Sequence, residues 1–163
     1  MTQMPTAAPI FLTPSDFLTH WLSHRRLTRR VIEAFPEDQL FTFTPAPPMR
    51  PFGEMAWEIQ GVSAYTLNGL VTDDWGEPVW DAQTARTRAA LLAAWDELSR
   101  RIEIELPGVT PERYAREHPL AWGPMTGWVA TIGVLDNEIH HRGQGYVYLR
   151  ALGVAPPPFW ERG

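Results

Sequence analysis

The sequence contains no cysteine. Disulfide bonds, cysteine-ligated zinc and a thiolate nucleophile supplied by the chain itself are therefore excluded. Any thiol that takes part in the chemistry of this protein must arrive with a ligand.

Long apolar runs are also absent. No stretch reaches the roughly 18 apolar residues that a transmembrane helix needs, and residues 1–9 lack the basic and apolar regions of a signal peptide. We therefore expect a cytoplasmic protein with no membrane partner.

Positive charge is in short supply. The chain has 14 Lys and Arg against 19 Asp and Glu, a formal net charge of −5 and a pI near 5.5. Nucleic acid is not an expected partner, because a phosphate backbone is bound by basic surfaces.

Apolar residues, by contrast, are plentiful. The 163 residues are 44% hydrophobic and 20% charged, with eight Trp, seven Phe and four Tyr. This composition favours a folded core, and the length predicts one domain over residues 1–163.

The apolar residues recur at helical spacing in four segments. Thr13 followed by Pro14 is typical of a helix start, and Gly153 before a proline run is typical of a helix end. The stretch 107–124 carries four prolines and is predicted to be irregular. The predicted helices cover about 14–35, 51–71, 81–106 and 125–152.

Two of these helices carry residues with chemical potential. Asn137 and His141 lie four residues apart, so they share one face of the last helix. Glu58 lies beside the apolar stripe of the second helix. In an all-α bundle, these side chains can meet across the interior.

Two motifs resemble the DinB/YfiT-like family of metalloenzymes. RPFGEMAWEI at 50–59 is similar to the opening of the family's second helix, and NEIHHRGQ at 137–144 to its signature in the fourth. The resemblance implies an up-down-down-up four-helix bundle, often a homodimer. It also implies a divalent metal held by one His of the second helix and a His-x-x-x-His pair of the fourth.

Carried over position by position, the metal ligands of the family fall on Glu58, Asn137 and His141, of which only His141 is a histidine. Three imidazoles suit zinc or nickel, whereas this set is better matched to manganese or magnesium. Similar proteins act as transferases or isomerases on small molecules, using a low-molecular-weight thiol activated by the metal. The resemblance therefore implies a thiol cosubstrate and a catalytic role for His141.

Simpler interpretations stand beside these. Glu58 is equally explained as a partly buried carboxylate paired with a cation, Asn137 as a hydrogen-bonding helix residue, and His141 as a donor to Glu58 without a metal. The alternative function is a non-catalytic dimeric bundle that binds a small-molecule ligand or a partner after losing the His triad. We expect Arg142 to pair with an acid or a neighbouring subunit.

Three further histidines carry no functional motif. His20 and His24 are four apart, but arginines follow them, which predicts a solvated or partner-contacting face rather than a metal site. His118 precedes a proline in the irregular stretch and is predicted to lie at the surface.

Overall fold

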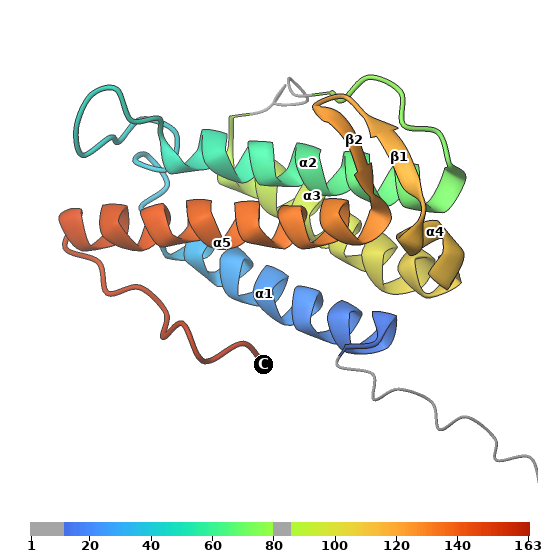
Figure 1. The fold of residues 1–163 in the computed structure, drawn as a ribbon. Helices are drawn as coiled ribbons and strands as arrows, with labels where there is room; N and C mark the ends of the chain where they lie inside the picture. The colour runs from blue at the N-terminus through green and yellow to red at the C-terminus, as the bar shows by residue number, and fades with distance from the viewer. Residues whose placement is uncertain (1–11, 80–85) are drawn as a thin grey trace, which may run out of the picture.

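The computed structural model describes residues 12–79 and 86–163, which are mostly helical (Figure 1). Four long helices pack lengthwise, α1 and α2 each contacting both α3 and α5. This arrangement creates a shared interior lined by one face of each helix. The long helices are α1 (Pro14–Ala34), α2 (Phe52–Thr72), α3 (Arg88–Glu105) and α5 (Gly127–Ala151).

The helix starts follow the local sequence. Thr13 caps α1: its side chain accepts from the backbone N–H of Asp16, whose carboxylate accepts from the backbone N–H of Thr13. This reciprocal pair satisfies two donors that a helix start leaves free. The third predicted helix, 81–106, starts later than expected. Among the described residues, α3 begins at Arg88 and Thr87 caps it. Residues 81–85 lie outside the described residues.

The stretch from 107 to 124 is more ordered than expected. It contains most of the short helix η1 (Leu106–Gly108), the short helix α4 (Pro111–Ala115), strand β1 (Glu117–Leu120) and the start of strand β2 (Gly123–Thr126). The two strands form an antiparallel hairpin. The described residues are thus mostly helical, as predicted, with a two-stranded sheet that the sequence patterns do not predict.

Two features of the sequence in this stretch indicate ordered structure. Thr110 followed by Pro111 repeats the Thr-Pro start of α1, and the Thr110 side chain accepts a hydrogen bond from the backbone N–H of Arg113 in α4. The hairpin turn ends at Gly123, whose φ of 117° is a conformation that favours glycine.

The apolar core consists of two clusters of buried side chains. One is built around residues such as Trp21, Leu67 and Val134. The other includes Phe35 and Phe52, whose stacked rings lie 4.8 Å apart. Burying each large apolar side chain contributes about 1.5–3 kcal/mol, so these clusters hold the four helices together.

Two expectations about histidines and their neighbours are wrong. His24 and Arg25 are buried, with relative exposures of 2% and 1%, whereas His20 is exposed as predicted. His118 is also buried, and its Nε2 lies 2.8 Å from the backbone oxygen of Arg113. The spacing of apolar residues does not predict the burial of these side chains, because their polar groups are satisfied by partners in the interior.

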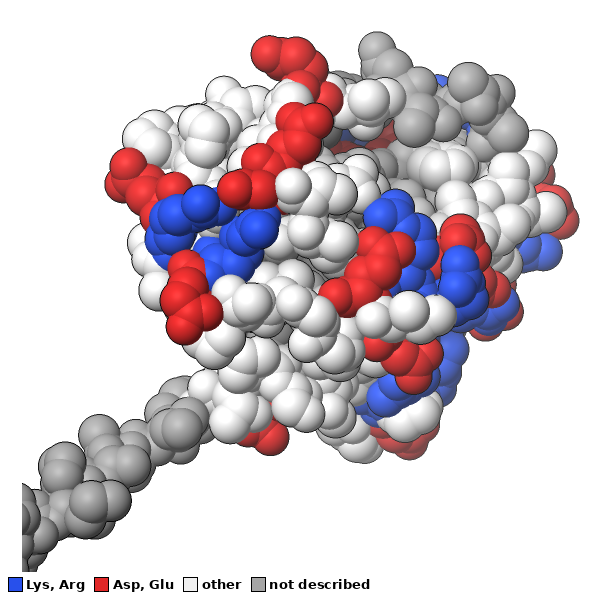
Figure 2. All heavy atoms as spheres, turned by 90° about the vertical axis from the view of Figure 1, so that its right-hand side faces the viewer, with Lys and Arg blue, Asp and Glu red and all other residues white. Residues whose placement is uncertain are grey.

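The charged side chains are mixed in sign. Figure 2 shows one end of the molecule, where acidic and basic residues alternate rather than forming a field of one sign. None of the helices in the described part of the chain is both long enough and apolar enough to cross a membrane.

Candidate functional site

The structure brings Glu58, Asn137 and His141 together. Glu58 lies on α2, and its Oε1 is 3.0 Å from Nε2 of His141 and 3.4 Å from Nδ2 of Asn137, both on α5. The four-residue spacing on α5 aims the amide and the imidazole at one carboxylate oxygen.

Arg50 completes this group. It lies in the segment before α2, and its Nη2 donates to Oε2 of Glu58 at 2.5 Å. The sequence patterns predict no role for Arg50, although they allow a cation as the partner of Glu58. The feature of the sequence that points to this pair is an arginine just before a helix that carries an acid beside its apolar stripe.

His141 contacts an oxygen at each ring nitrogen. Its Nδ1 lies 2.9 Å from Oε1 of Gln144, and its Nε2 faces Glu58. A ring with one proton can donate to only one of these oxygens, and donating to both requires two ring protons. With its proton on Nε2 the ring donates to Glu58. With the single proton on Nδ1, the lone pair of Nε2 faces the carboxylate, an arrangement that a cation between the two would stabilise.

The charge of Glu58 is set by opposing influences. Partial burial acts to raise the pKa of its carboxyl group, but the hydrogen bonds from Arg50 and His141 and the positive charge of Arg50 outweigh burial. The net effect lowers the pKa of Glu58, so the carboxylate is ionised at neutral pH.

A pocket of about 330 Å³ opens beside this group, between α2, the hairpin and α5. Glu58 and Asn137 form its polar end, and the remaining walls are mainly apolar. The Oδ1 atom of Asn137 is buried and has no hydrogen-bond partner among the described residues. The other lining residues are Val62, Trp122, Met125, Val129, Ala130, Gly133 and Val134.

Beneath the site lies a buried network of charges. Nη1 of Arg142 is 3.6 Å from Oε1 of Glu138 and donates to Oγ1 of Thr28 at 2.9 Å. Arg142 therefore pairs with an acid, one of the two partners predicted for it. Burial raises the pKa of Glu138, against the positive charges of Arg25 and Arg142 and the hydrogen bond from Thr28.

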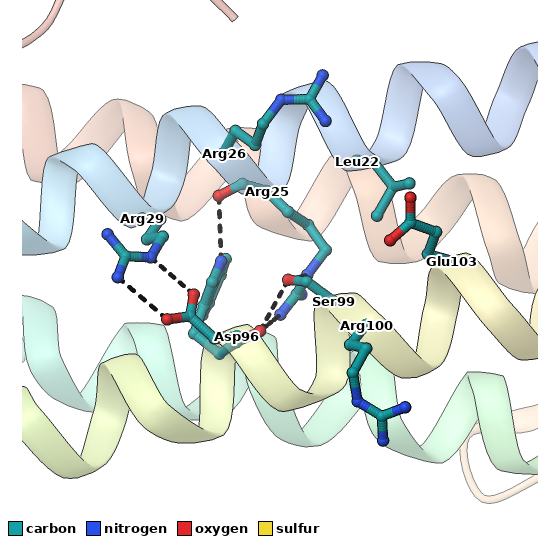
Figure 3. A pocket seen from close by; sticks show the side chains of 9 residues that line it. Leu22, Arg25, Arg26, Arg29, Asp96, Ser99, Arg100 and Glu103 are labelled. Atoms are coloured by element: carbon teal, nitrogen blue, oxygen red, sulfur yellow. Dashed lines mark hydrogen bonds and ion pairs between the residues drawn. The ribbon is translucent and has the colours of Figure 1, made fainter. Parts of the chain in front are cut away.

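A second hollow, of about 280 Å³, lies between α1 and α3 (Figure 3). Four arginines line it, but their charges are largely used within the fold. Arg29 donates to both carboxylate oxygens of Asp96 (Figure 3), and Arg100 pairs with Glu97.

Arg25 forms part of the wall of this hollow and is held by neutral groups. It donates to Oγ of Ser99, Oε1 of Gln60 and the backbone oxygen of Trp95, and its guanidinium lies 4.1 Å from the centre of the Trp95 ring. Burial lowers the pKa of Arg25 to about 10. These contacts tie α1 to α2 and α3, so we assign this hollow a structural role.

The donor set at Glu58 does not match a tightly held zinc or nickel ion. It offers one imidazole, one carboxylate and one amide, and amide oxygen is a weak ligand for these metals. The guanidinium of Arg50 already contacts the carboxylate. Within residues 12–79 and 86–163, no group of three or more His, Asp or Glu side chains is arranged to hold a metal ion.

Comparison with known proteins identifies the family of this chain. The sequence profile of the DinB family matches residues 4–162. The chain belongs to the DinB family. The uncharacterized protein YjoA of Bacillus subtilis (strain 168) is 24% identical to this DinB-family protein over 151 residues, covering 91% of this chain and 96% of YjoA.

Solved structures agree with the family assignment. The crystal structure of YjoA, a DinB-like protein, matches this DinB-family protein with a TM-score of 0.73, covering 90% of this chain and 97% of YjoA. A DinB-like protein from Bacillus cereus ATCC 10987 matches with a TM-score of 0.73 at 18% identity, covering 91% and 99% of the two chains. At these identities the likeness concerns the fold.

Proposed function

We propose that this DinB-family protein binds a small, mainly apolar molecule in the pocket beside Glu58 and Asn137, without a tightly held metal. The observation that carries the proposal is an apolar pocket whose polar end is formed by Glu58 and Asn137, together with the Oδ1 atom of Asn137, which is buried and has no partner among the described residues. A buried acceptor without a partner costs about 1–3 kcal/mol. A ligand in the pocket recovers this free energy if a small movement of the Asn137 side chain brings Oδ1 within reach of its donor.

The matching ligand has an apolar body and a head group with N–H or O–H donors. The apolar walls favour the body through removal of its surface from water. Asn137 selects the head, because the hydrogen bond from its Nδ2 to Glu58 fixes the amide orientation and leaves Oδ1 to accept.

Benzamide and toluene provide a direct test, since they share a ring and differ in the donor group. Titrations followed by nuclear magnetic resonance should show tighter binding of benzamide, and Asn137→Leu should remove this preference while retaining toluene binding. Equal affinities of the parent protein for the two probes would contradict the role of Asn137.

A metal-dependent thiol transferase or isomerase is the second candidate. The contact between Nδ1 of His141 and Oε1 of Gln144 favours it, because a ring that donates from Nδ1 turns an unprotonated Nε2 toward Glu58, where the nitrogen and the carboxylate can together ligate a cation. Metal analysis of untagged protein separates the candidates: we expect well below one metal ion per chain, and one zinc, nickel or manganese ion per chain would favour the enzyme.

The thiol reaction makes its own prediction. In an assay supplemented with metal and candidate thiols, His141→Ala should abolish turnover and Asn137→Ala should retain part of it, because only the imidazole ligates strongly or acts as a base near neutral pH. Parent-level rates in both variants would remove the catalytic candidate.

We further propose a homodimer and an up-down-down-up helix order. Exposed apolar residues along α5, namely Val129, Ile132, Ile139 and Val147, support an interface between two copies. The helix directions in Figure 1, with α1 and α5 opposed to α2 and α3, support the helix order. Light scattering at micromolar concentration tests the dimer, and a monomeric mass would contradict it.

A further inference from the structure

The carboxylate of Glu58 is enclosed by donors from two parts of the chain. Arg50 occupies one oxygen, and His141 and Asn137 share the other. The imidazole nitrogen of His141, the amide oxygen of Asn137 and this carboxylate are also the kinds of group that bind divalent ions. The cation beside them in this chain is a guanidinium.

Arg50 is anchored rather than loosely placed. Its backbone oxygen accepts a hydrogen bond of 2.9 Å from the hydroxyl of Tyr148, a residue of α5 with 0% exposure. This contact ties the segment before α2 to the helix that carries Asn137 and His141. The guanidinium of Arg50 supplies the positive charge that pairs with the carboxylate of Glu58.

A divalent ion bound to Glu58 would lie close to this guanidinium. The ion and the guanidinium are both positive, and close like charges repel strongly where water is partly excluded. Water is partly excluded here because Glu58 is half-buried. Binding of a divalent ion would therefore require Arg50 to move away from the carboxylate, and the ion pair between Arg50 and Glu58 would be lost.

We propose that Arg50 is a built-in cation that takes the place of a divalent ion among Glu58, Asn137 and His141. Arg50, together with the weakened ligand set, keeps metals out of the site. This inference goes beyond the ligand-binding function proposed above and does not depend on it, because the apolar pocket can hold a molecule whether or not Arg50 excludes metals.

A second ion pair, formed by another glutamate of α2, supplies the matched control. Arg86 donates to Oε1 of Glu54 at 2.8 Å, one turn before Glu58. The side-chain exposures are similar, 51% and 33% for this pair and 49% and 29% for Arg50 and Glu58. Only the Arg50 pair has an imidazole and an amide beside its carboxylate.

The experiment is calorimetric titration of zinc chloride and manganese chloride into the parent protein, Arg50→Met and Arg86→Met. We expect Arg50→Met to bind at least one of the metals about tenfold or more tightly than the parent, and Arg86→Met to match the parent. A parent-like affinity of Arg50→Met for both metals would overturn the proposal, as would an equal gain in Arg86→Met.

Two further variants keep the result interpretable. Arg50→Gln removes the charge but keeps a polar head, and it replaces Arg50→Met if circular dichroism shows that Arg50→Met is unfolded. His141→Ala added to the Arg50 variant should abolish the gain in affinity. A gain that persists without His141 would show that the metal binds elsewhere and would overturn the proposal.

Discussion

Acid should weaken the fold through His24. Burial lowers the pKa of this imidazole to about 3 from an ordinary 6.5, and the positive charges of Arg142 and Arg162 and of the neighbouring His20 act in the same direction. The two arginine contacts are close, 2.7 Å from Nη2 of Arg142 to Nδ1 and 3.0 Å from Nη1 of Arg162 to Nε2. A protonated ring can accept from neither.

The sign follows from the two protonation equilibria. Below pH 6.5 the unfolded chain binds a proton at His24, whereas the folded protein does not bind one until about pH 3. The stability is therefore complete above pH 6.5 and falls as the pH drops through this window. The loss is about 1.4 kcal/mol per pH unit, or about 2 kcal/mol between pH 7 and pH 5.

Urea denaturation of the parent and His24→Asn at a series of pH values isolates this contribution. Asparagine retains an acceptor for Arg142 and does not titrate, so the other acids and histidines cancel in the difference between the two proteins. The free energy of unfolding of the parent should fall by about 2 kcal/mol more than that of the variant between pH 7 and pH 5. Parallel pH profiles would refute the reasoning.

Two comparisons of stability test the packing and the helix caps. In Gly145→Ala the new Cβ would lie 2.6 Å from Cε2 of Phe52, which should cost about 1–3 kcal/mol. In Gly143→Ala the new Cβ meets nothing within 4 Å, so that change should stabilise α5 by up to about 1 kcal/mol; thermal denaturation of both variants checks the opposite signs. Thr126→Ala removes the side-chain cap of α5 and should cost about 1 kcal/mol, whereas Thr126→Ser should retain most of the stability in the same assay.

Much of the fold was predictable because the helices carry strong local signals. The start of α1 followed from Thr13 and Pro14, and apolar spacing located all four long helices. The hairpin was not predictable from periodicity, because its strands are four residues long and each contains a proline. The interior positions of His24 and Arg25 depend on partners from other helices, such as Arg142 and Gln60, which no local pattern reveals.

The site was predictable in its centre and not at its edge. The convergence of Glu58, Asn137 and His141 followed from helical spacing and the family resemblance. The role of Arg50 depends on how the segment before α2 folds back against α5, where Tyr148 holds it. The pocket depends on the hairpin that supplies part of its wall, so its shape was outside the reach of the sequence.

Filling the pocket tests the central claim most directly. Gly133 lines the pocket, and a Cβ at this position meets nothing within 4 Å, so Gly133→Leu places a side chain in open space. Gly143, ten residues later on the same helix and equally open, provides the control Gly143→Leu. In titrations with benzamide, Gly133→Leu should bind about tenfold or more weakly than the parent, a loss of about 1.4 kcal/mol, and Gly143→Leu should match the parent. Unchanged affinity in Gly133→Leu, or no binding by the parent, would contradict the account.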